Sequence, residues 1–412
     1  MKKKELFVLI LFSIFFIFLT MNRHSRAGLF NYHSEIWADK AGYNVYLPAL
    51  FIYNFNANSL PDSIEIKTGM GFNVDKFNNK IISKYPYGVA LLQSPFWLVA
   101  HLIDTNKTGY TKIYHKAIDV AAVFYFMIGL FFLYQILKGK SNTNIVTLTL
   151  IISITATNLL YYAIWETGMS HIYSFATMTI IIYLISKQIF DYKLVLFGLL
   201  YFIIRPINVL FLIPIILLFN NNWDIKQRIL SLLTKNNIVA CVLLGVILIA
   251  PQLLYNNYAF GGYFNFYNGE KFDYLLNPKI LEVLFAPNNG LFLYSPIIPF
   301  TMTIGVLNKN TRKEFICLFL ILIIYTYTYG AWWSYMLGCG FGHRGFIDIL
   351  PVFIIYLFNV INQNIDSKVI LIILFLLCIY SLKLTFIFDG CFYGAWDWDW
   401  SAFFKFFANK AK

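Results

Sequence analysis

The chain alternates long apolar runs with short polar connections along most of its length. A helix needs about 20 apolar residues to cross the hydrocarbon core of a bilayer, and it satisfies its own backbone hydrogen bonds there. Ten runs approach or exceed that length: residues 5–21, 117–137, 144–164, 168–187, 193–219, 238–255, 290–307, 315–331, 345–361 and 368–388. This pattern predicts an all-α fold, a polytopic membrane protein with residues 1–412 forming a single domain.

Composition supports the same fold class and argues against a water-soluble globule. Hydrophobic residues make up 59% of the chain and charged residues only 13%, against about 25% charged in an ordinary soluble domain. A surface with so few charges has to be covered by lipid. The net charge of +12 would point to nucleic acid in a soluble protein. Here most basic residues lie in short loops, so we interpret them as topology signals, with membrane lipids and not nucleic acid as partners.

Basic residues in short loops orient membrane helices, because such loops stay in the cytoplasm. Lys2, Lys3 and Lys4 therefore place the amino terminus in the cytoplasm. The first run is interpreted as an uncleaved span and not as a signal peptide, since no A-x-A-like cleavage site precedes Arg23. We expect a multi-pass protein of the plasma membrane, the inner membrane of a bacterial cell, with its active face periplasmic or extracellular.

Residues 193–219 are either one overlong helix or a hairpin of two short helices. The basic loops before and after this run should both be cytoplasmic, which requires the run to cross the membrane twice. The turn is expected at Arg205-Pro206, because proline removes a backbone donor and clashes with the preceding turn. With this hairpin the chain has about eleven transmembrane helices and its carboxyl terminus lies outside.

The same topology places residues 22–116 in one large outer loop. Its apolar stretch 85–103 is interrupted by proline and too short to span comfortably, so we expect it to lie in the membrane interface as an amphipathic helix. Smaller outer segments are 256–289, 332–344 and 389–412.

Polar residues near membrane depth are costly, so each one invites a functional hypothesis. Glu35 and Asp39 follow the first span four residues apart, a spacing that places both carboxylates on one face of a helix. The alternative is an ordinary solvated helix in a loop. Lys84 opens the interfacial stretch, where it either serves a site or simply meets lipid phosphate. His171 lies at the outer end of a span, where a histidine can also be an ordinary helix-end residue.

Two arginines are candidates for binding an anion. Arg205 stands at the tip of the apolar hairpin, where it either snorkels or meets an anionic partner. Arg344 ends a glycine-rich loop that starts at Trp332-Trp333, and its guanidinium fits phosphate well. Together with one carboxylate pair, these cations suit the deprotonation of a hydroxyl beside a phosphate leaving group.

Metal and disulfide chemistry are not expected from the pattern. The histidines show no metal-ligand spacing, and the Asp397-Trp398-Asp399 sequence is better explained by an aromatic belt than by a metal–nucleotide site. No cofactor is therefore predicted, and a divalent metal is doubtful. The scattered cysteines are interpreted as small core residues without disulfides: Cys241, Cys317, Cys339, Cys378 and Cys391.

The order and sidedness of these motifs resemble the GT-C superfamily of integral-membrane glycosyltransferases, which includes protein O-mannosyltransferases and the lipid A aminoarabinose transferase. The resemblance extends from the first span to about residue 352. It rests on Glu35 and Asp39, Lys84-Tyr85-Pro86 with Gly88 and Pro95, Met169-Ser170-His171, Arg205-Pro206, the stretch from Gly290 to Pro296, and Trp332-Trp333 through Gly342-His343-Arg344 with Pro351.

The resemblance implies transfer of a sugar, with inversion, from a polyprenyl-phosphate donor to a lipid, glycan or protein acceptor in cell-envelope polysaccharide biosynthesis. By similarity, Asp39 is the catalytic base, with Glu35 as its neighbour or substitute. Lys84, Arg205 and Arg344 are expected to bind the donor phosphate. The substrate pocket is expected to include Tyr43, Tyr85, His171, Trp333 and His343.

The chain also departs from parts of the superfamily. It ends soon after the last span, without the soluble carboxyl-terminal domain of many relatives, and Trp332-Trp333-Ser334-Tyr335 differs from the W-W-D-x-G motif of oligosaccharyltransferases. A transporter or a flippase for lipid-linked saccharides is the alternative, because broken spans and buried arginine also suit substrate pathways. A third hypothesis is a non-catalytic subunit of polysaccharide assembly.

The topology gives a direct prediction for labelling of single introduced cysteines with a membrane-impermeant reagent. We expect positions near residue 270 to react from outside and positions near residue 228 to react only after permeabilisation. Reaction of both regions from the same side would contradict the double crossing of residues 193–219.

Overall fold

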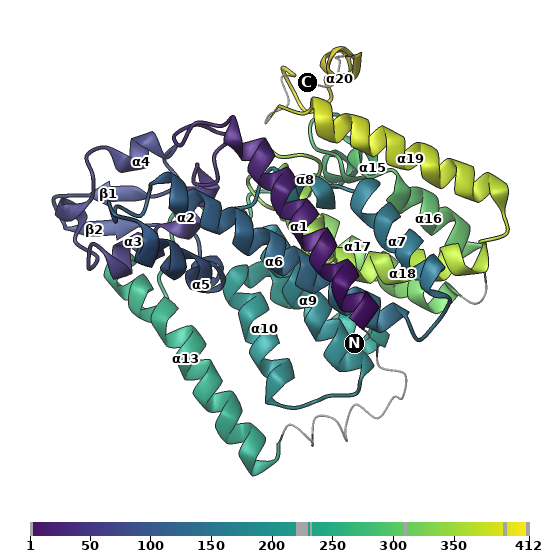
Figure 1. The fold of residues 1–412 in the computed structure, drawn as a ribbon, viewed down its shortest axis with the longest axis horizontal. Coiled ribbons are helices and arrows are strands. Elements are labelled where there is room, and N and C mark those ends of the chain that lie inside the picture. The colour runs from purple at the N-terminus through teal and green to yellow at the C-terminus, as the bar shows by residue number, and fades with distance from the viewer. Residues whose placement is uncertain (1–2, 220–229, 231–232, 309–310, 390–393, 409–412) are drawn as a thin grey trace.

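Helices make up most of the computed structural model, which describes residues 3–219, 230, 233–308, 311–389 and 394–408. Four helices in this part of the chain are long and apolar enough to cross a membrane (Figure 1). They are α1 (Lys3–Ser25), α6 (Lys112–Leu137), α13 (Lys235–Phe260) and α19 (Lys368–Ile387). The apolar helices that are shorter than a full span include α9 (Ser170–Ser186), α10 (Tyr192–Ile204), α17 (Arg312–Gly330) and α18 (Leu350–Gln363).

The centre of the helical body is the contact between α6 and α9. Nearly every side chain of α9 is buried, as expected for a helix surrounded by other helices. Gly129 of α6 lies so close to the Phe175 ring that an added Cβ would be only 2.5 Å from it. This close approach explains the glycine at that position. Helix α1 lies against α6 on the outside of this pair (Figure 1).

The predicted break in residues 193–219 is present. Helix α10 ends at Ile204, Arg205 is in an extended conformation, and the 3-10 turn η2 (Pro206–Phe211) begins at the proline. Helix α11 (Leu212–Phe219) follows. In Figure 1 the amino ends of α10 and α13 both lie at the lower edge of the molecule, as expected if α10 and α11 form a hairpin.

Two other predicted spans are also broken. Residues 144–164 form α7 (Thr143–Thr155) and α8 (Leu159–Ile164), separated where the Thr157 hydroxyl bonds to the carbonyl of Ser153 and to the amide of Leu159. Residues 290–307 form α15 (Leu291–Tyr294) and α16 (Ile297–Val306), separated by Ser295 and Pro296. Proline accounts for the second break because it cannot donate a helical hydrogen bond.

The first outer segment folds into short elements packed on the ends of the long helices. They are α2 (Asp39–Asn44), α3 (Tyr46–Phe51), η1 (Ala57–Ser59), α4 (Ile64–Lys67), β1 (Asn73–Asp75), β2 (Lys80–Ile82) and α5 (Gly88–Ile103). Strands β1 and β2 pair antiparallel, so the all-α prediction misses one small hairpin. Helix α5 forms within the stretch predicted to be helical, with Pro95 inside it.

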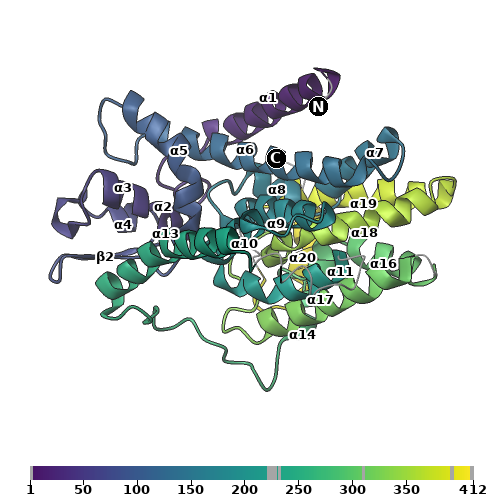
Figure 2. The same cartoon turned by 90° about the horizontal axis from the view of Figure 1, so that it is seen from below.

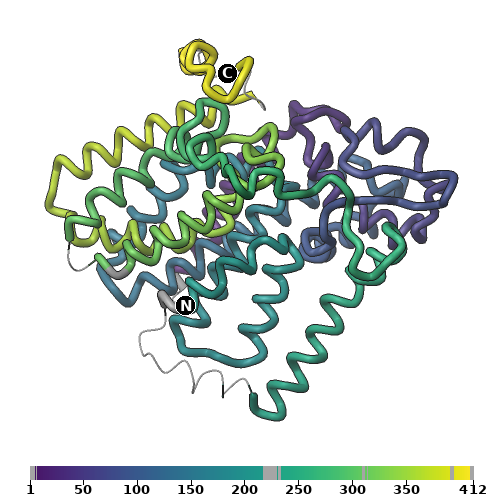
Figure 3. Tube along the Cα trace, turned by 180° about the vertical axis from the view of Figure 1, so that it is seen from behind, coloured from purple at the N-terminus to yellow at the C-terminus, as the bar shows by residue number. Residues whose placement is uncertain are grey.

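The carboxyl-terminal half packs beside this body. A long loop after α13 runs outside the helices before it reaches α14 (Ile280–Phe285), as Figures 2 and 3 show. The 3-10 turn η4 (Arg344–Asp348) leads into α18, and α20 (Trp400–Ala408) is the last described helix.

The segments predicted to lie outside contact one another. Lys84 pairs with Glu270, Asp39 pairs with Arg344, and the Tyr335 hydroxyl donates to Asp397. Cys339, in the third of these segments, is disulfide-bonded, which corrects the expectation that all five cysteines are plain core residues.

Candidate active site

The shortest contacts among the predicted site residues join Asp39 to two of them. One oxygen of the Asp39 carboxylate accepts a hydrogen bond from the Tyr85 hydroxyl at 2.6 Å, and the other accepts from the Arg344 guanidinium at 2.8 Å. About one third of the Asp39 side chain is exposed. The Asp39 carboxylate is therefore held in place by two donors and is still partly accessible, as a base that receives a proton needs to be.

The backbone before Asp39 explains how the carboxylate is placed. Ala38 adopts a positive φ of 48°, and its amide donates to the carbonyl of Thr68. Gly71 packs directly on Ala38, where an added Cβ would overlap the Ala38 carbonyl oxygen. In the same helix the buried Lys40 pairs with Glu166 at 3.1 Å. These contacts fix the start of α2 at Asp39.

Arg344 is placed by a buried histidine. His343 lies beside Tyr325, whose hydroxyl contacts Nδ1, and its Nε2 is 2.8 Å from the carbonyl of Tyr335. Because a carbonyl only accepts, Nε2 carries a proton. Burial, together with the nearby arginines, lowers the pKa of His343 to about 3, so the ring is neutral. His343 therefore supports the loop and does not exchange protons near neutral pH.

Lys84 is engaged by a residue that the sequence did not indicate. Its ammonium is 2.6 Å from one carboxylate oxygen of Glu270, and the indole N–H of Trp333 donates to the other at 3.0 Å. The ammonium also lies 5.3 Å from the ring centre of Tyr85, a cation–π distance. Lys84, Tyr85 and Trp333 are thus gathered at one place around Glu270.

Arg205 belongs to a second, more deeply buried group. Its Nε lies 3.5 Å from a carboxylate oxygen of Asp348, whose other oxygen is 3.0 Å from Nδ1 of His171. The Asp348 and His171 side chains are fully buried, whereas 16% of the Arg205 side chain remains exposed. Nη1 of Arg205 also lies 3.2 Å from Nδ1 of His171, so Asp348 and His171 together hold the guanidinium.

Tyr43 connects the two groups. Its hydroxyl donates to Ser170 at 3.2 Å, next to His171, and its ring packs on Tyr85 with centroids 4.4 Å apart. Burial raises the pKa of Tyr43, and the charge of Arg205 partly offsets this rise.

Burial would also raise the pKa of Asp39, but the charge of Arg344 and the Tyr85 hydrogen bond lower it overall. Asp39 is thus ionised at neutral pH.

Glu35 does not share a helical face with Asp39, because α2 begins only at Asp39. The Glu35 side chain is instead buried among residues of α1 and α6. His115 lies 2.9 Å from one of its oxygens and Lys116 lies 2.8 Å from the other. Burial alone would raise the pKa of Glu35, but these partners lower it. Glu35 holds the outer loop to the helices and is not beside the candidate base.

The same buried cluster contains the group that could hold a metal ion. His24, Glu35 and Asp119 offer ligand atoms within 4.8 Å of one another. Lys116, however, contacts both carboxylates, at 2.8 Å and 3.0 Å, and already supplies a positive charge between them. His24 lies 2.8 Å from Asp119 on the opposite side. The charges are better explained as an internal ion-pair network than as a metal site.

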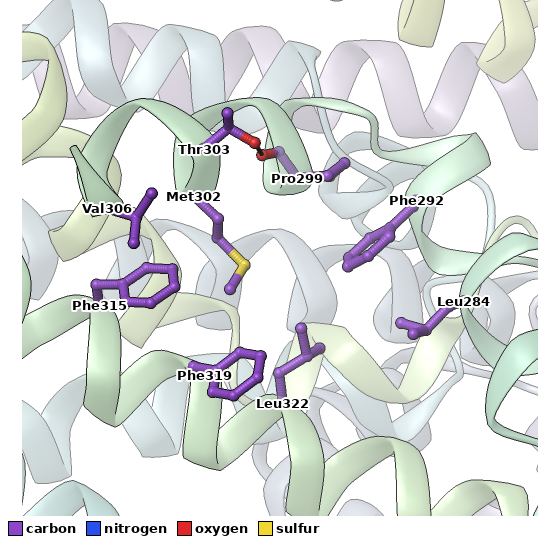
Figure 4. A pocket seen from close by; sticks show the side chains of 9 residues that line it. All are labelled: Leu284, Phe292, Pro299, Met302, Thr303, Val306, Phe315, Phe319 and Leu322. Atoms are coloured by element: carbon purple, nitrogen blue, oxygen red, sulfur yellow. Dashed lines mark hydrogen bonds between the residues drawn. The ribbon is translucent and has the colours of Figure 1, made fainter.

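Two apolar cavities lie away from these charged residues. One, of about 350 Å³, is lined only by apolar side chains and Thr303, and Figure 4 shows it between α16 and α17. The other, of about 600 Å³, lies between α6, α9 and α10 and has Lys193 as its charged lining residue. Neither is lined by Asp39, Lys84, Arg205 or Arg344.

Sequence reasoning missed Glu270 and Asp348. Glu270 is 186 residues from Lys84 and stands in a loop without a recognisable motif, so no local signal indicates it. Asp348 follows Arg344 by four residues. An acidic residue so close to Arg344, just before an apolar helix, could have indicated that Asp348 belongs to the candidate site.

The comparisons do not identify a family. No protein-family model, no curated protein and no solved structure matches the chain.

The buried network around Glu35 can be tested by removing its central cation. Lys116→Met leaves two buried carboxylates without their ammonium, and we expect it to lower the free energy of unfolding by about 3 kcal/mol. Lys112→Met, at the exposed first residue of α6 one turn earlier, is the matched control and should change it by less than about 0.5 kcal/mol. Denaturant unfolding in detergent measures both, and equal effects would show that Lys116 adds no stability through the network.

Proposed function

We propose that this protein is an integral-membrane glycosyltransferase of GT-C type that uses a polyprenyl-phosphate-linked sugar. The observation that carries the proposal is the convergence of one ionised carboxylate, Asp39, with cations from separate parts of the chain. Arg344 contacts Asp39 directly, and Lys84 acts on the same carboxylate electrostatically. The charges of Arg205 and Arg344 both oppose the rise that burial causes in the pKa of Tyr43. The Tyr43 ring packs on Tyr85, the hydrogen-bond partner of Asp39.

In the proposed reaction Asp39 accepts the proton of an acceptor hydroxyl. The hydroxyl oxygen forms a new bond to the anomeric carbon of the sugar, and the bond from that carbon to the phosphate oxygen breaks. The polyprenyl phosphate leaves with the electron pair and an additional negative charge. Fixed cations stabilise that charge more strongly in a water-poor interface than they would in water.

The pairing of Arg205 with Asp348 sharpens its proposed role. Asp348 and His171 contact Nε and Nη1 of Arg205, and a guanidinium fork can bind phosphate bidentately where lysine cannot. The fully buried Asp348 carboxylate gives Arg205 a partner inside the protein, which supports a binding role over that of a snorkelling topology anchor. Burying that pair is costly and calls for a function that needs a fixed cation.

The proposed topology has about eleven spans, with the site on the outer face of the plasma membrane. The mutual contacts of the four outer segments support it, since residues on opposite sides of a bilayer cannot pair. The cavity between α6, α9 and α10 favours the second candidate function, a flippase for lipid-linked saccharides, because it offers an apolar space beside a broken helix. A flippase would move the lipid without breaking the sugar–phosphate bond.

The proposal predicts the effect of neutralising Asp39. Asp39→Asn keeps the shape of the side chain but cannot accept the proton, so turnover should fall by about 10²–10⁴-fold, while donor binding is retained. Turnover is measured as transfer of radiolabelled sugar from polyprenyl-phosphate donors to membrane lipids, glycans or proteins by the purified protein. Asp62→Asn, which removes an exposed carboxylate of the same outer loop, is the control and should leave turnover unchanged.

Two outcomes would contradict the proposal. Transfer at the wild-type rate by Asp39→Asn would remove Asp39 from the mechanism. Movement of the intact labelled lipid across the bilayer, with the sugar–phosphate bond unbroken, would favour the flippase.

A further inference from the structure

Each of the cations assigned to the donor phosphate is already paired with a carboxylate. Arg344 pairs with Asp39, Arg205 with Asp348 and Lys84 with Glu270. An incoming phosphate therefore has to compete with carboxylates that belong to the protein. Their burial shows which one can give way, because a buried carboxylate that loses its cation pays a large desolvation cost.

Glu270 is the carboxylate best placed to exchange. Asp348 is fully buried and also contacts His171. Asp39 is about one third exposed, but its partner Arg344 is only 16% exposed, and Asp39 opens helix α2. Glu270 stands in a loop and is about one quarter exposed, and its partner Lys84 is about one third exposed. Water can solvate both groups when they separate.

The backbone around Glu270 also permits the exchange. Residue Lys271 begins a stretch tied to the loop after α17, since the amide of Trp333 donates to the Lys271 carbonyl and the amide of Tyr274 donates to Ala331. Glu270 stands just before these ties. Gly269 adopts a φ of +115°, a conformation that few other residues tolerate, and it turns the backbone just before Glu270.

We propose that Glu270 is an exchange carboxylate: it leaves Lys84 when the lipid-linked phosphodiester binds and returns to it to expel the phosphomonoester product. The inference rests on the proposed function and names the residue that governs product release. No covalent bond forms at Glu270, and only its ion pair is exchanged.

The charge of the two ligands gives the reason. The donor is a phosphodiester with one negative charge, whereas the product is a phosphomonoester that carries about −1.5 to −2 at neutral pH. Cations arranged to stabilise the leaving phosphate would therefore hold the product more tightly than the donor. A carboxylate that competes for Lys84 offsets this, and its repulsion acts most strongly on the ligand with the greater charge.

The test measures binding and does not require turnover. Farnesyl monophosphate and farnesyl methyl phosphate are titrated against the full chain in phosphatidylcholine nanodiscs. Glu270→Gln keeps an acceptor for the Trp333 indole but loses the charge, so it should bind the monoester about fivefold more tightly than wild type. The diester should gain only about twofold. Lys84→Ala should weaken binding of both ligands and cancel the gain in the double variant.

The control is Asp273→Asn. Asp273 pairs with Lys271 in the same loop, and its loss removes one negative charge without touching Lys84. It should leave both affinities at their wild-type values. Glu270→Ala provides a second variant, and thermal unfolding checks that each protein is intact.

The outcomes separate this inference from the proposed function. Lys84-dependent binding that Glu270→Gln and Glu270→Ala do not tighten would overturn the exchange role alone. An equal gain for monoester and diester would overturn the product-release role. Absence of Lys84-dependent binding of either ligand to the wild-type chain would overturn the phosphate site itself.

Discussion

The ion pair between Asp39 and Arg344 joins parts of the chain that are 305 residues apart. It connects the first outer segment to the loop that precedes α18, so residues from distant parts of the sequence meet at the candidate site. Half-buried charges of this kind are stable only as partners, because either one alone would be costly beside lipid. Tyr85 donates to the same carboxylate, Lys84 lies over the Tyr85 ring, and Glu270 pairs with Lys84. These residues therefore form one connected group with the ion pair.

The same constraint extends to the other cations. Where Arg205 enters the helical body, Asp348 and His171 surround it, and the whole group is nearly closed to water. The site therefore contains matched positive and negative charges in place of an open basic patch. In the proposed function, an anion competes with a protein carboxylate for its cation. The affinity then depends on the ligand's charge, which distinguishes the proposed phosphodiester donor from its phosphomonoester product.

Part of the architecture could be predicted from apolar run lengths and loop charge. The helical fold, the break at Arg205-Pro206 and the contacts among the predicted outer segments are present. Four helices of the described part of the chain are long enough for a full span, so the count of about eleven stays a prediction. Breaks within predicted helices, such as the one at Thr157, were not predicted. A side-chain hydroxyl that bonds to the backbone does not change the hydropathy profile enough to reveal the break.

The site was predicted in part. Asp39, Tyr85 and Arg344 are together, as expected. Glu35 is not, because a spacing of four residues places side chains on one face only inside a helix, and α2 begins too late. Glu270 has no local signal at all, since its partner is remote in the sequence.

The proposed lipid-phosphate site beside Asp39 can be observed in a cryo-EM structure of the protein in nanodiscs with an added polyprenyl phosphate. We expect phosphate density within hydrogen-bond distance of Arg344 and Arg205, with the Lys84 ammonium turned from Glu270 towards it. Phosphate bound elsewhere, with the Asp39–Arg344 and Lys84–Glu270 pairs unchanged, would show that these cations do not bind the lipid phosphate.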